Sequence, residues 1–246
     1  MKELFTLYLT NNQHQNFDLK AVIFDMDGVL YDSMPAHDIS WRKTMDEFKL
    51  EYIPNEFYLQ EGMLAKRTID KIFQRNVGRD ATTEEEKKIY ARKSELFQQH
   101  NTDGAMPGAR ETLEYVRGEG LTTVLVTGSA QPSLLNKLDS HFPGAFKPET
   151  MVTAFDVKHG KPHPEPFLMG LQKGGNLKPN QAIVIENAPL GVEAAVKAGI
   201  FTIAVNTGPL SDSVLTDAGA AVVFRSMTAL REAMPEILNL ARTARA

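Results

Sequence analysis

The chain alternates between short apolar runs and more polar stretches along most of its length. Apolar runs occupy residues 22–24, 121–126, 151–153, 182–185 and 200–205, and we interpret them as strands. The stretches between the later runs favour helix, at residues 109–118, 132–141, 164–173 and 190–198. Short apolar strands separated by helices predict a parallel sheet with helices on both faces, because each parallel crossover places a helix over the sheet.

Residues 36–100 follow a different pattern, with helical stretches and no strand signal. We expect helices at residues 36–49, 55–60, 64–76 and 83–100. The last has a start signal, since Thr82 and Thr83 precede three glutamates that favour the positive end of a helix dipole. The prediction is a Rossmann-like α/β domain, residues 17–33 and 105–246, interrupted after its first strand by an all-helical domain, residues 34–104.

The amino-terminal segment, residues 1–16, mixes apolar and polar positions. It has no long apolar run and no small-residue cleavage site, so we do not interpret it as a signal peptide. We expect a loose leader before the first strand. No apolar run approaches the roughly 18 residues that a membrane-spanning helix needs, so no membrane association is expected.

Composition narrows the class of protein. Of the 246 residues, 42% are hydrophobic and 24% charged, as in a globular protein of one large or two small domains. The net charge of −4 does not suggest a nucleic-acid partner, which would need a basic stripe. Cysteine is absent, which excludes disulfides, thiolate metal sites and cysteine nucleophiles and fits a reducing compartment. We expect a cytoplasmic monomer.

The first apolar run leads directly into Asp25, Asp27 and Gly28. Strand alternation would send the two carboxylates to opposite faces, but a turn at the strand end lets both face one site. That site would lie at the carboxyl edge of the sheet, where open α/β sheets bind ligands. Two neighbouring carboxylates repel, so they require a cation or a proton between them. Asp and Gly are also ordinary turn residues, so these positions alone fit an acidic turn equally well.

Two further loops follow strands and carry polar residues. Thr127, Gly128 and Ser129 follow the run at 121–126, where a hydroxyl and free backbone amides suit a phosphate, although a plain helix cap is the more ordinary explanation. Lys161 lies in a loop stiffened by three prolines. It could neutralise a phosphate or a nucleophilic carboxylate, or simply be solvated.

Glu186 and Asn187 follow the run at 182–185. They offer oxygen ligands of the kind that Mg²⁺ prefers, although Asn187 could instead cap a helix. Each strand end is a weak signal by itself. Together they form a set typical of Mg²⁺-assisted phosphoryl transfer, in which a carboxylate attacks phosphorus, a second acid moves protons and cations screen the phosphate oxygens.

From Lys20 onward the sequence resembles the haloacid dehalogenase superfamily of phosphatases and phosphomutases. Four motifs occur in the family's order: DMDGVLYDS, VTGS, GKPHPEP and VIENAPLGVEAAVKAG. The position of the helical insert resembles the cap domain of the β-phosphoglucomutase-like subgroup. The resemblance implies that a small phosphorylated compound is the substrate.

The resemblance also implies a role for each motif residue. Asp25 would be the nucleophile that becomes an aspartyl phosphate, and Asp27 the general acid and base. Thr127 and Lys161 would hold the phosphoryl group. Mg²⁺ would be bound by the Asp25 side chain, the Asp27 backbone carbonyl and a side chain of the fourth motif.

At that last point family members often have Glu-Asp, whereas this chain has Glu186-Asn187, which removes one negative charge. The ligand could therefore be either residue. The helical insert should select the leaving group. His37, Trp41 and Lys93 match positions in the mutases, although Trp41 fits a core residue and Lys93 could be solvated. The candidate substrate contacts are Gly28, His37, Glu61, Lys93, Gly128 and Ser129.

Glu61 and the loop after it distinguish this chain from the mutases. In β-phosphoglucomutases the loop after the glycine that matches Gly62 carries an arginine for the distal phosphate, and the matching position here is Ala65. A carboxylate at position 61 would repel a second phosphate unless it meets a cation or a proton. We therefore expect Glu61 to complete the Mg²⁺ shell and to favour a compact substrate. Lys66 and Arg67 could still contact a phosphate.

Proteins that share the runs MVTAFDVK, VIENAPLGV and AGIFTIAVNTGPL with this chain resemble inorganic pyrophosphatases of the same subgroup. They usually have Arg-Thr-Gly after the Glu-Gly pair, where this chain has Met63-Leu64-Ala65. The expected function is Mg²⁺-dependent hydrolysis of a small phosphate compound, with inorganic pyrophosphate preferred. The alternative is β-phosphoglucomutase activity. A non-catalytic binding protein is disfavoured because Asp25 and Asp27 are both present.

Overall fold

The computed structural model describes the whole chain except residues 103 and 130–136. Its centre is one parallel sheet with the strand order β3-β2-β1-β4-β5-β6. The strands are β1 (Ala21–Phe24), β2 (Thr122–Val126), β3 (Met151–Val152), β4 (Ala182–Glu186), β5 (Phe201–Val205) and β6 (Val222–Phe224). The predicted parallel α/β core is confirmed. Strand β6 is an addition, and the other bounds move by one residue.

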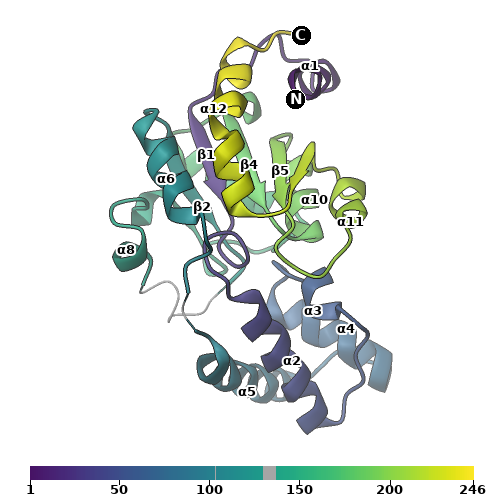
Figure 1. Ribbon diagram of the computed structural model, residues 1–246. Helices are drawn as coiled ribbons and strands as arrows, with labels where there is room; N and C mark the ends of the chain where they lie inside the picture. The colour runs from purple at the N-terminus through teal and green to yellow at the C-terminus, as the bar shows by residue number, and fades with distance from the viewer. Residues whose placement is uncertain (103, 130–136) are drawn as a thin grey trace.

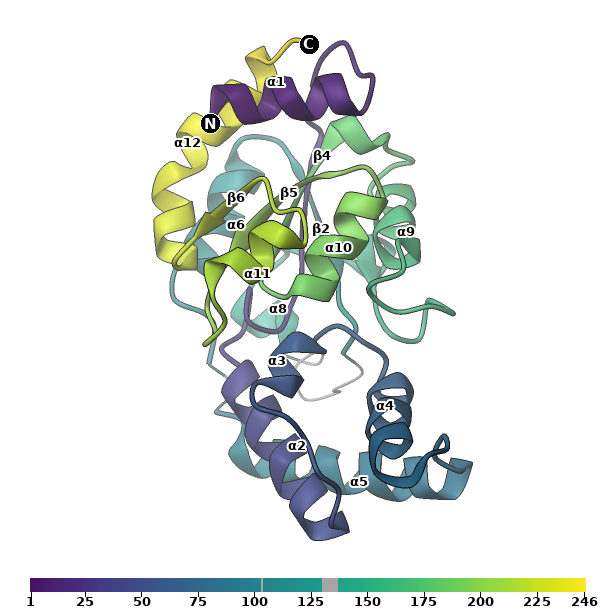
Figure 2. The same cartoon turned by 90° about the vertical axis from the view of Figure 1, so that its right-hand side faces the viewer.

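Helices cover both faces of the sheet (Figures 1 and 2). Val22 and Phe24 of β1 belong to a core cluster shared with α1 (Lys2–Asn11), α6 (Ala109–Gly118) and α12 (Met227–Thr243). Ala21 and Ile23 point the other way, into a cluster with α9 (Glu165–Lys173) and α10 (Pro189–Lys197). Burial of both faces explains why the strands are continuous apolar runs.

The remaining short elements connect these layers. They are α8 (Leu138–His141), α11 (Asp212–Asp217) and two 3₁₀ turns, Pro148–Thr150 and Pro179–Gln181. The first half of the helix expected at 132–141 lies outside the described residues, and α8 occupies the end of its second half. Neither α11 nor α12 was anticipated from the sequence.

The amino-terminal segment is a docked helix, so the expected loose leader is wrong. Phe5 and Leu9 of α1 are fully buried in the core. The Phe5 ring stacks on Phe201 of β5 with a centroid distance of 4.2 Å. Asn16 forms a bridge with Arg245, so the two ends of the chain lie together.

Four helices lie at the carboxyl edge of the sheet, apart from its two faces (Figures 1 and 2). They are α2 (Met34–Phe48), α3 (Glu56–Leu59), α4 (Ala65–Val77) and α5 (Thr83–His100), and we call these helices and the loops that join them the helical layer. They have their own apolar cluster, in which Trp41 stacks on Phe57. Their bounds agree with the expected helices within two residues. Whether the layer is a separate domain stays a prediction.

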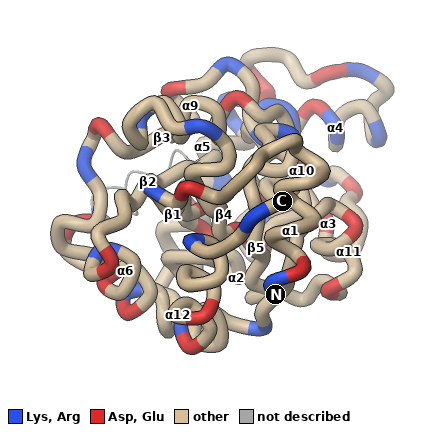
Figure 3. Tube along the Cα trace, turned by 90° about the horizontal axis from the view of Figure 1, so that it is seen from above, with Lys and Arg blue, Asp and Glu red and all other residues tan. Residues whose placement is uncertain are grey.

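Charged residues of both signs are interspersed over the trace in Figure 3, without a broad area of one sign in that view. Among the described residues, no helix is both long and apolar enough to cross a bilayer.

Candidate active site at the carboxyl edge of the sheet

Three neighbouring strands deliver the first polar groups to one place. Asp25 follows β1, Thr127 follows β2 and Glu186 ends β4. Strand β1 pairs with both β2 and β4, so these ends are adjacent. Lys161 arrives from the loop after β3. All four side chains are buried, although each is polar or charged. Buried charges must be paired, and this set is.

Lys161 links two carboxylates. Its ammonium donates to Asp25 Oδ1 and, at 2.6 Å, to Glu186 Oε1. The other oxygen of Glu186 accepts from the backbone amides of Asn187 and Ala188, at 2.8 and 2.9 Å. A side chain at Gly191 would collide with the Glu186 carboxylate, so glycine makes room for it. Glu186 is therefore fixed as the anchor of Lys161.

Carboxyl groups outnumber cationic side chains at the site. Burial, reinforced by Glu186 and Asp27, raises the pKa of Asp25 to about 8, while Lys161 opposes the shift. Burial opposes the charge of Lys161, but its two carboxylate partners raise its pKa above the ordinary value. The ammonium therefore stays charged, and a further cation would relieve the remaining carboxylate repulsion.

Asp27 is held differently from Asp25. Its Oδ1 accepts from Ser33 Oγ at 2.5 Å and lies 3.1 Å from His37 Nε2. Burial alone would raise the pKa of Asp27, but His37, Ser33 and Lys93 together hold it below the ordinary value. Asp27 is therefore ionised, and its neighbours donate to it.

A chain of hydrogen bonds leads from Asp27 into the helical layer. His37 of α2 lies between Asp27 and Lys93 of α5, whose Nζ is 2.7 Å from His37 Nδ1. Burial and the nearby Lys93 charge lower the pKa of His37, so the ring is neutral and donates through Nε2. Burial also lowers the pKa of Lys93 to about 7. The charge of Lys93, and with it the hydrogen bonds of this series, can therefore change near neutral pH.

Glu61 reaches the sheet edge from the loop between α3 and α4. Its Oε2 accepts from the Asn187 amide at 2.9 Å. The other oxygens of these two groups, Glu61 Oε1 and Asn187 Oδ1, are buried and have no hydrogen-bond partner among the described residues. Burial and the charge of Asp25 raise the pKa of Glu61 well above its ordinary value. Two unpaired buried oxygens beside excess carboxylates match the ligands that a hard cation prefers.

The helical layer touches the core loops closely around Glu61. A Cβ at Gly62 would lie 2.6 Å from the Lys161 side chain, and a Cβ at Gly128 would lie 2.6 Å from the Gly62 carbonyl oxygen. Gly28, with a φ of +77°, similarly leaves room for the Asn187 carboxamide. Glycine at these positions lets the layer close directly over Lys161.

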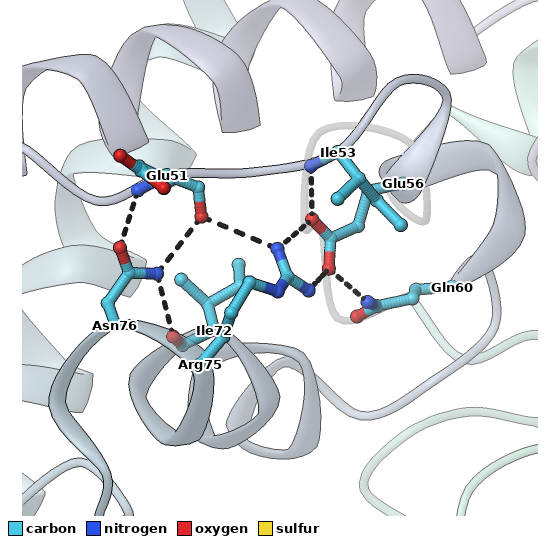
Figure 4. A network of polar contacts seen from close by, with 7 residues as sticks. All are labelled: Glu51, Ile53, Glu56, Gln60, Ile72, Arg75 and Asn76. Atoms are coloured by element: carbon cyan, nitrogen blue, oxygen red, sulfur yellow. Dashed lines mark hydrogen bonds and ion pairs between the residues drawn. The ribbon is translucent and has the colours of Figure 1, made fainter.

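An ion pair between buried Glu56 and partly exposed Arg75 holds the segment that leads to Glu61 (Figure 4). The two terminal nitrogens of Arg75 donate to Glu56, Nη1 at 2.8 Å to Oε2 and Nη2 to Oε1. The same carboxylate accepts from the Ile53 amide at 2.9 Å and from Gln60 Nε2 at 2.7 Å. Since Gln60 directly precedes Glu61, this network positions the loop from within the helical layer.

A cavity of about 80 Å³ lies between the helical layer and the sheet edge. Its polar lining comes mainly from Asp27, His37, Glu61, Lys93 and Ser129. Its apolar lining comes from Met34, Trp41, Phe57, Met63 and Ala65. The cavity therefore joins the Asp27 carboxylate to a compartment built by the helical layer.

Comparison with known proteins identifies the family. The family described as haloacid dehalogenase-like hydrolase matches residues 19–199. The chain belongs to this family. A solved structure from Bacteroides vulgatus, described as a candidate β-phosphoglucomutase, is 50% identical and covers 98% of each chain with a TM-score of 0.95.

Two curated relatives of this hydrolase are phosphatases. A phosphorylated carbohydrates phosphatase of Thermotoga maritima is 29% identical, in an alignment that covers 84% of this chain and 94% of the relative. Hexitol phosphatase A of Escherichia coli is 32% identical over 76% of this chain and 83% of its own. Together with the structural likeness, these findings support a haloacid dehalogenase-type phosphatase or phosphomutase.

The structure brings the sequence-predicted residues of this hydrolase into one region. The core residues lie at the sheet edge, and the cavity lining includes His37, Glu61, Lys93, Gly128 and Ser129. Thr127 Oγ1 accepts from the Ser129 amide at 2.9 Å. Asn187 does not cap α10, whose N-cap is Ala188.

Some residues lie elsewhere than the sequence suggested, and others were not recognised from the sequence. Lys66 and Arg67 are exposed, and Lys66 pairs with Asp70 at 2.7 Å. Ser33 was missed as a partner of Asp27. It stands before a helix with proline near its start, which suggests a cap, yet its hydroxyl makes no cap bond. The Glu56–Arg75 pair was also missed, since no motif marks it.

Proposed function

We propose that this protein is a Mg²⁺-dependent phosphohydrolase with inorganic pyrophosphate as its preferred substrate. The observation that carries the proposal is the contact between Glu61 and Asn187, which places a carboxylate of the helical layer against the acidic core. Without a cation, that carboxylate would repel an anionic substrate. With one, it adds a ligand at the place where the layer closes.

The residues fit a hard divalent ion. Asp25, the backbone carbonyl of Asp27, Asn187 and Glu61 would hold Mg²⁺ through oxygen, the ligand type that this ion takes. The buried oxygens of Asn187 and Glu61 that have no hydrogen-bond partner in the described structure support their inclusion. Glu186 is a weaker candidate, because the charged Lys161 ammonium occupies one of its oxygens and two backbone amides occupy the other. Bound Mg²⁺ would supply positive charge that screens the carboxylates and the phosphoryl oxygens.

The side chains divide the reaction between them. Asp25 attacks phosphorus and forms an aspartyl phosphate, while the bond from phosphorus to the leaving oxygen breaks. Lys161 stabilises the charge of the carboxylate and of the transferred oxygens. Asp27 then takes a proton from the water that cleaves the acyl phosphate. This second role fits an Asp27 that is ionised in the free protein.

The ionised Asp27 also favours a good leaving group. A sugar alkoxide must be protonated as it departs, and the ionised Asp27 would have to gain a proton before it could supply one. Orthophosphate is a much weaker base than a sugar alkoxide, so pyrophosphate cleavage depends less on that proton. Lys93 and His37 line the cavity and would contact the departing phosphate.

The size of the cavity supports a compact substrate. Its volume of about 80 Å³ is well below the ~300–1,000 Å³ that is usual for ligand pockets. A mutase must also bind a distal phosphate, and the exposed Lys66 and Arg67 do not line the cavity. Both observations favour pyrophosphate over glucose phosphates.

A second candidate function is hydrolysis of a phosphorylated sugar or sugar alcohol. The curated relatives from Thermotoga maritima and Escherichia coli carry such names. The apolar lining from Met34, Trp41 and Phe57 would suit a carbon skeleton. Opening of the helical layer would be needed to admit it.

A substrate panel with the full chain and Mg²⁺ tests the proposal. It contains pyrophosphate, hexose and hexitol phosphates, and β-glucose 1-phosphate with detection of glucose 6-phosphate. We expect the highest kcat/KM for pyrophosphate, and loss of phosphate release in Asp25→Asn. Faster release from a sugar phosphate would favour the second candidate. Isomerisation without net release would overturn hydrolysis, and full turnover in Asp25→Asn would overturn the covalent mechanism.

A further inference from the structure

The loop that carries Lys161, together with the first residue of α9, presents a group of side chains of the types that ligate metals. His159, His163 and Glu165 each offer one ligand atom, and these atoms lie within 4.8 Å of one another. The active site uses none of them. Two imidazoles and one carboxylate are a donor set of borderline ions such as Zn²⁺, whereas Mg²⁺ prefers oxygen alone.

The carboxylate of this cluster is already oriented. Glu165 accepts from the backbone amides of Lys158 and His159, at 2.9 and 3.0 Å. His159 Nδ1 lies 2.8 Å from Glu165 Oε2, and His163 Nδ1 lies 3.9 Å from the same atom. The two imidazole rings stand side by side, with centroids 4.7 Å apart.

These distances are close to those that an ion would impose. A tetrahedral Zn²⁺ with bonds of about 2.1 Å holds its ligand atoms about 3.4 Å apart. The present separations of 2.8 and 3.9 Å lie on either side of that value. His163 Nδ1 would exchange the hydrogen bond that it now accepts from the Glu165 amide for the ion. Side-chain rotations then bring the ligands together, and the proton that His159 Nδ1 shares with Glu165 moves to Nε2 or to solvent when the ion binds.

We infer that His159, His163 and Glu165 form a binding site for Zn²⁺, separate from the catalytic centre. Both histidine side chains are more than half exposed, so the ion can enter from solvent and keep a water as its fourth ligand. Backbone amides on the carboxylate supply the outer support that metal ligands commonly have.

Occupation of the site ties the two ends of the Lys161 loop together. His159 and His163 stand two residues before and after Lys161. Gly160 packs so closely on Leu64 of the helical layer that a Cβ would lie 2.8 Å from the leucine side chain. A bound ion should therefore slow amide hydrogen exchange across residues 158–165.

The test is calorimetric titration of the metal-free full chain with ZnCl₂ in a large excess of Mg²⁺, which occupies the carboxylate centre. We expect one Zn²⁺ equivalent in the wild type that is missing in His159→Ala/His163→Ala and weakened at least tenfold in His163→Gln. His14→Ala is the matched control, because it removes an imidazole far from the loop. X-ray absorption of the bound zinc should show imidazole scattering, and exchange should slow in residues 158–165.

Equal zinc isotherms in the wild type and the double variant would overturn the site. So would an isotherm in which Mg²⁺ displaces the zinc. The single His163→Gln variant, which retains a polar side chain on an exposed loop, keeps the test decisive if the double variant fails to fold.

Discussion

The Glu56–Arg75 ion pair gives a direct test of how the helical layer holds Glu61 in place (Figure 4). Glu56 is 1% exposed and Arg75 is 35% exposed. Arg75→Met removes the guanidinium but keeps most of the aliphatic stem. The Glu56 carboxylate then retains its hydrogen bonds from Ile53 and Gln60 but loses its counter-charge.

The expected cost follows from this partial burial. Removing one partner of a fully buried ion pair costs about 3–5 kcal/mol, because the other charge is left without compensation. Here water reaches one side of the arginine, and two hydrogen bonds to Glu56 survive. We therefore expect Arg75→Met to lower the free energy of unfolding by about 2–3 kcal/mol.

Arg79→Met is the matched control. Arg79 also pairs through its two terminal nitrogens with a glutamate, Glu85, but both side chains are at least one third exposed. Exposed pairs contribute about 0.2–1 kcal/mol, so this variant should lose less than about 1 kcal/mol. The two variants remove the same group from the same fold and differ in the burial of its partner.

Urea denaturation followed by Trp41 fluorescence measures both variants. Trp41 is the single tryptophan of the chain and stacks on Phe57 within the helical layer. A second measurement is the Mg²⁺ concentration for half-maximal phosphate release, which should rise in Arg75→Met alone. Equal small losses of stability in both variants would refute the buried anchor. A large loss with an unchanged Mg²⁺ requirement would refute its link to Glu61.

Three further predictions concern the site itself. Glu61→Ala should reduce pyrophosphate hydrolysis far more than Ser129→Ala, and equal small effects in steady-state assays would remove Glu61 from the site. Asn187→Asp adds a carboxylate and should lower the Mg²⁺ concentration for half-maximal activity, so an unchanged midpoint would count against Asn187 as a ligand. Burial lowers the pKa of Lys93 from 10.5 to about 7, so between these values the unfolded chain binds the extra proton. The free energy of unfolding should therefore rise with pH across that window relative to Lys93→Met, whereas parallel curves would contradict it.

The core of the site was predictable because it depends on topology. Residues that follow parallel strands meet at one edge whatever the details of packing, so Asp25, Thr127 and Glu186 could be grouped from the sequence. Which side-chain oxygen is available to bind a metal ion could not be predicted in this way. Lys161 and backbone amides occupy both oxygens of Glu186, whereas the side-chain oxygen of Asn187 has no hydrogen-bond partner in the described part of the chain, and neither fact can be read from the sequence.

Elements held by distant contacts were the least predictable. Helix α1 has a mixed sequence, and its burial depends on Phe201 rather than on its own pattern. Arg75 lies 19 positions from Glu56, beyond the reach of local spacing rules. The cytoplasmic compartment and the monomeric state stay predictions from composition.

The docking of α1 has a consequence for synthesis of the chain on the ribosome. Phe5 stacks on Phe201, and Gln15 accepts a hydrogen bond from the amide of the final residue, Ala246. Helix α1 is therefore synthesised well before Phe201 and Ala246, two of the residues that hold it. At about 5–20 residues per second, translation of the intervening ~200 residues takes about 10–40 s. During that interval Phe17 can already pack on Phe5, but Phe201 is absent, so much of the apolar side of α1 lacks its native cover and is open to chaperones.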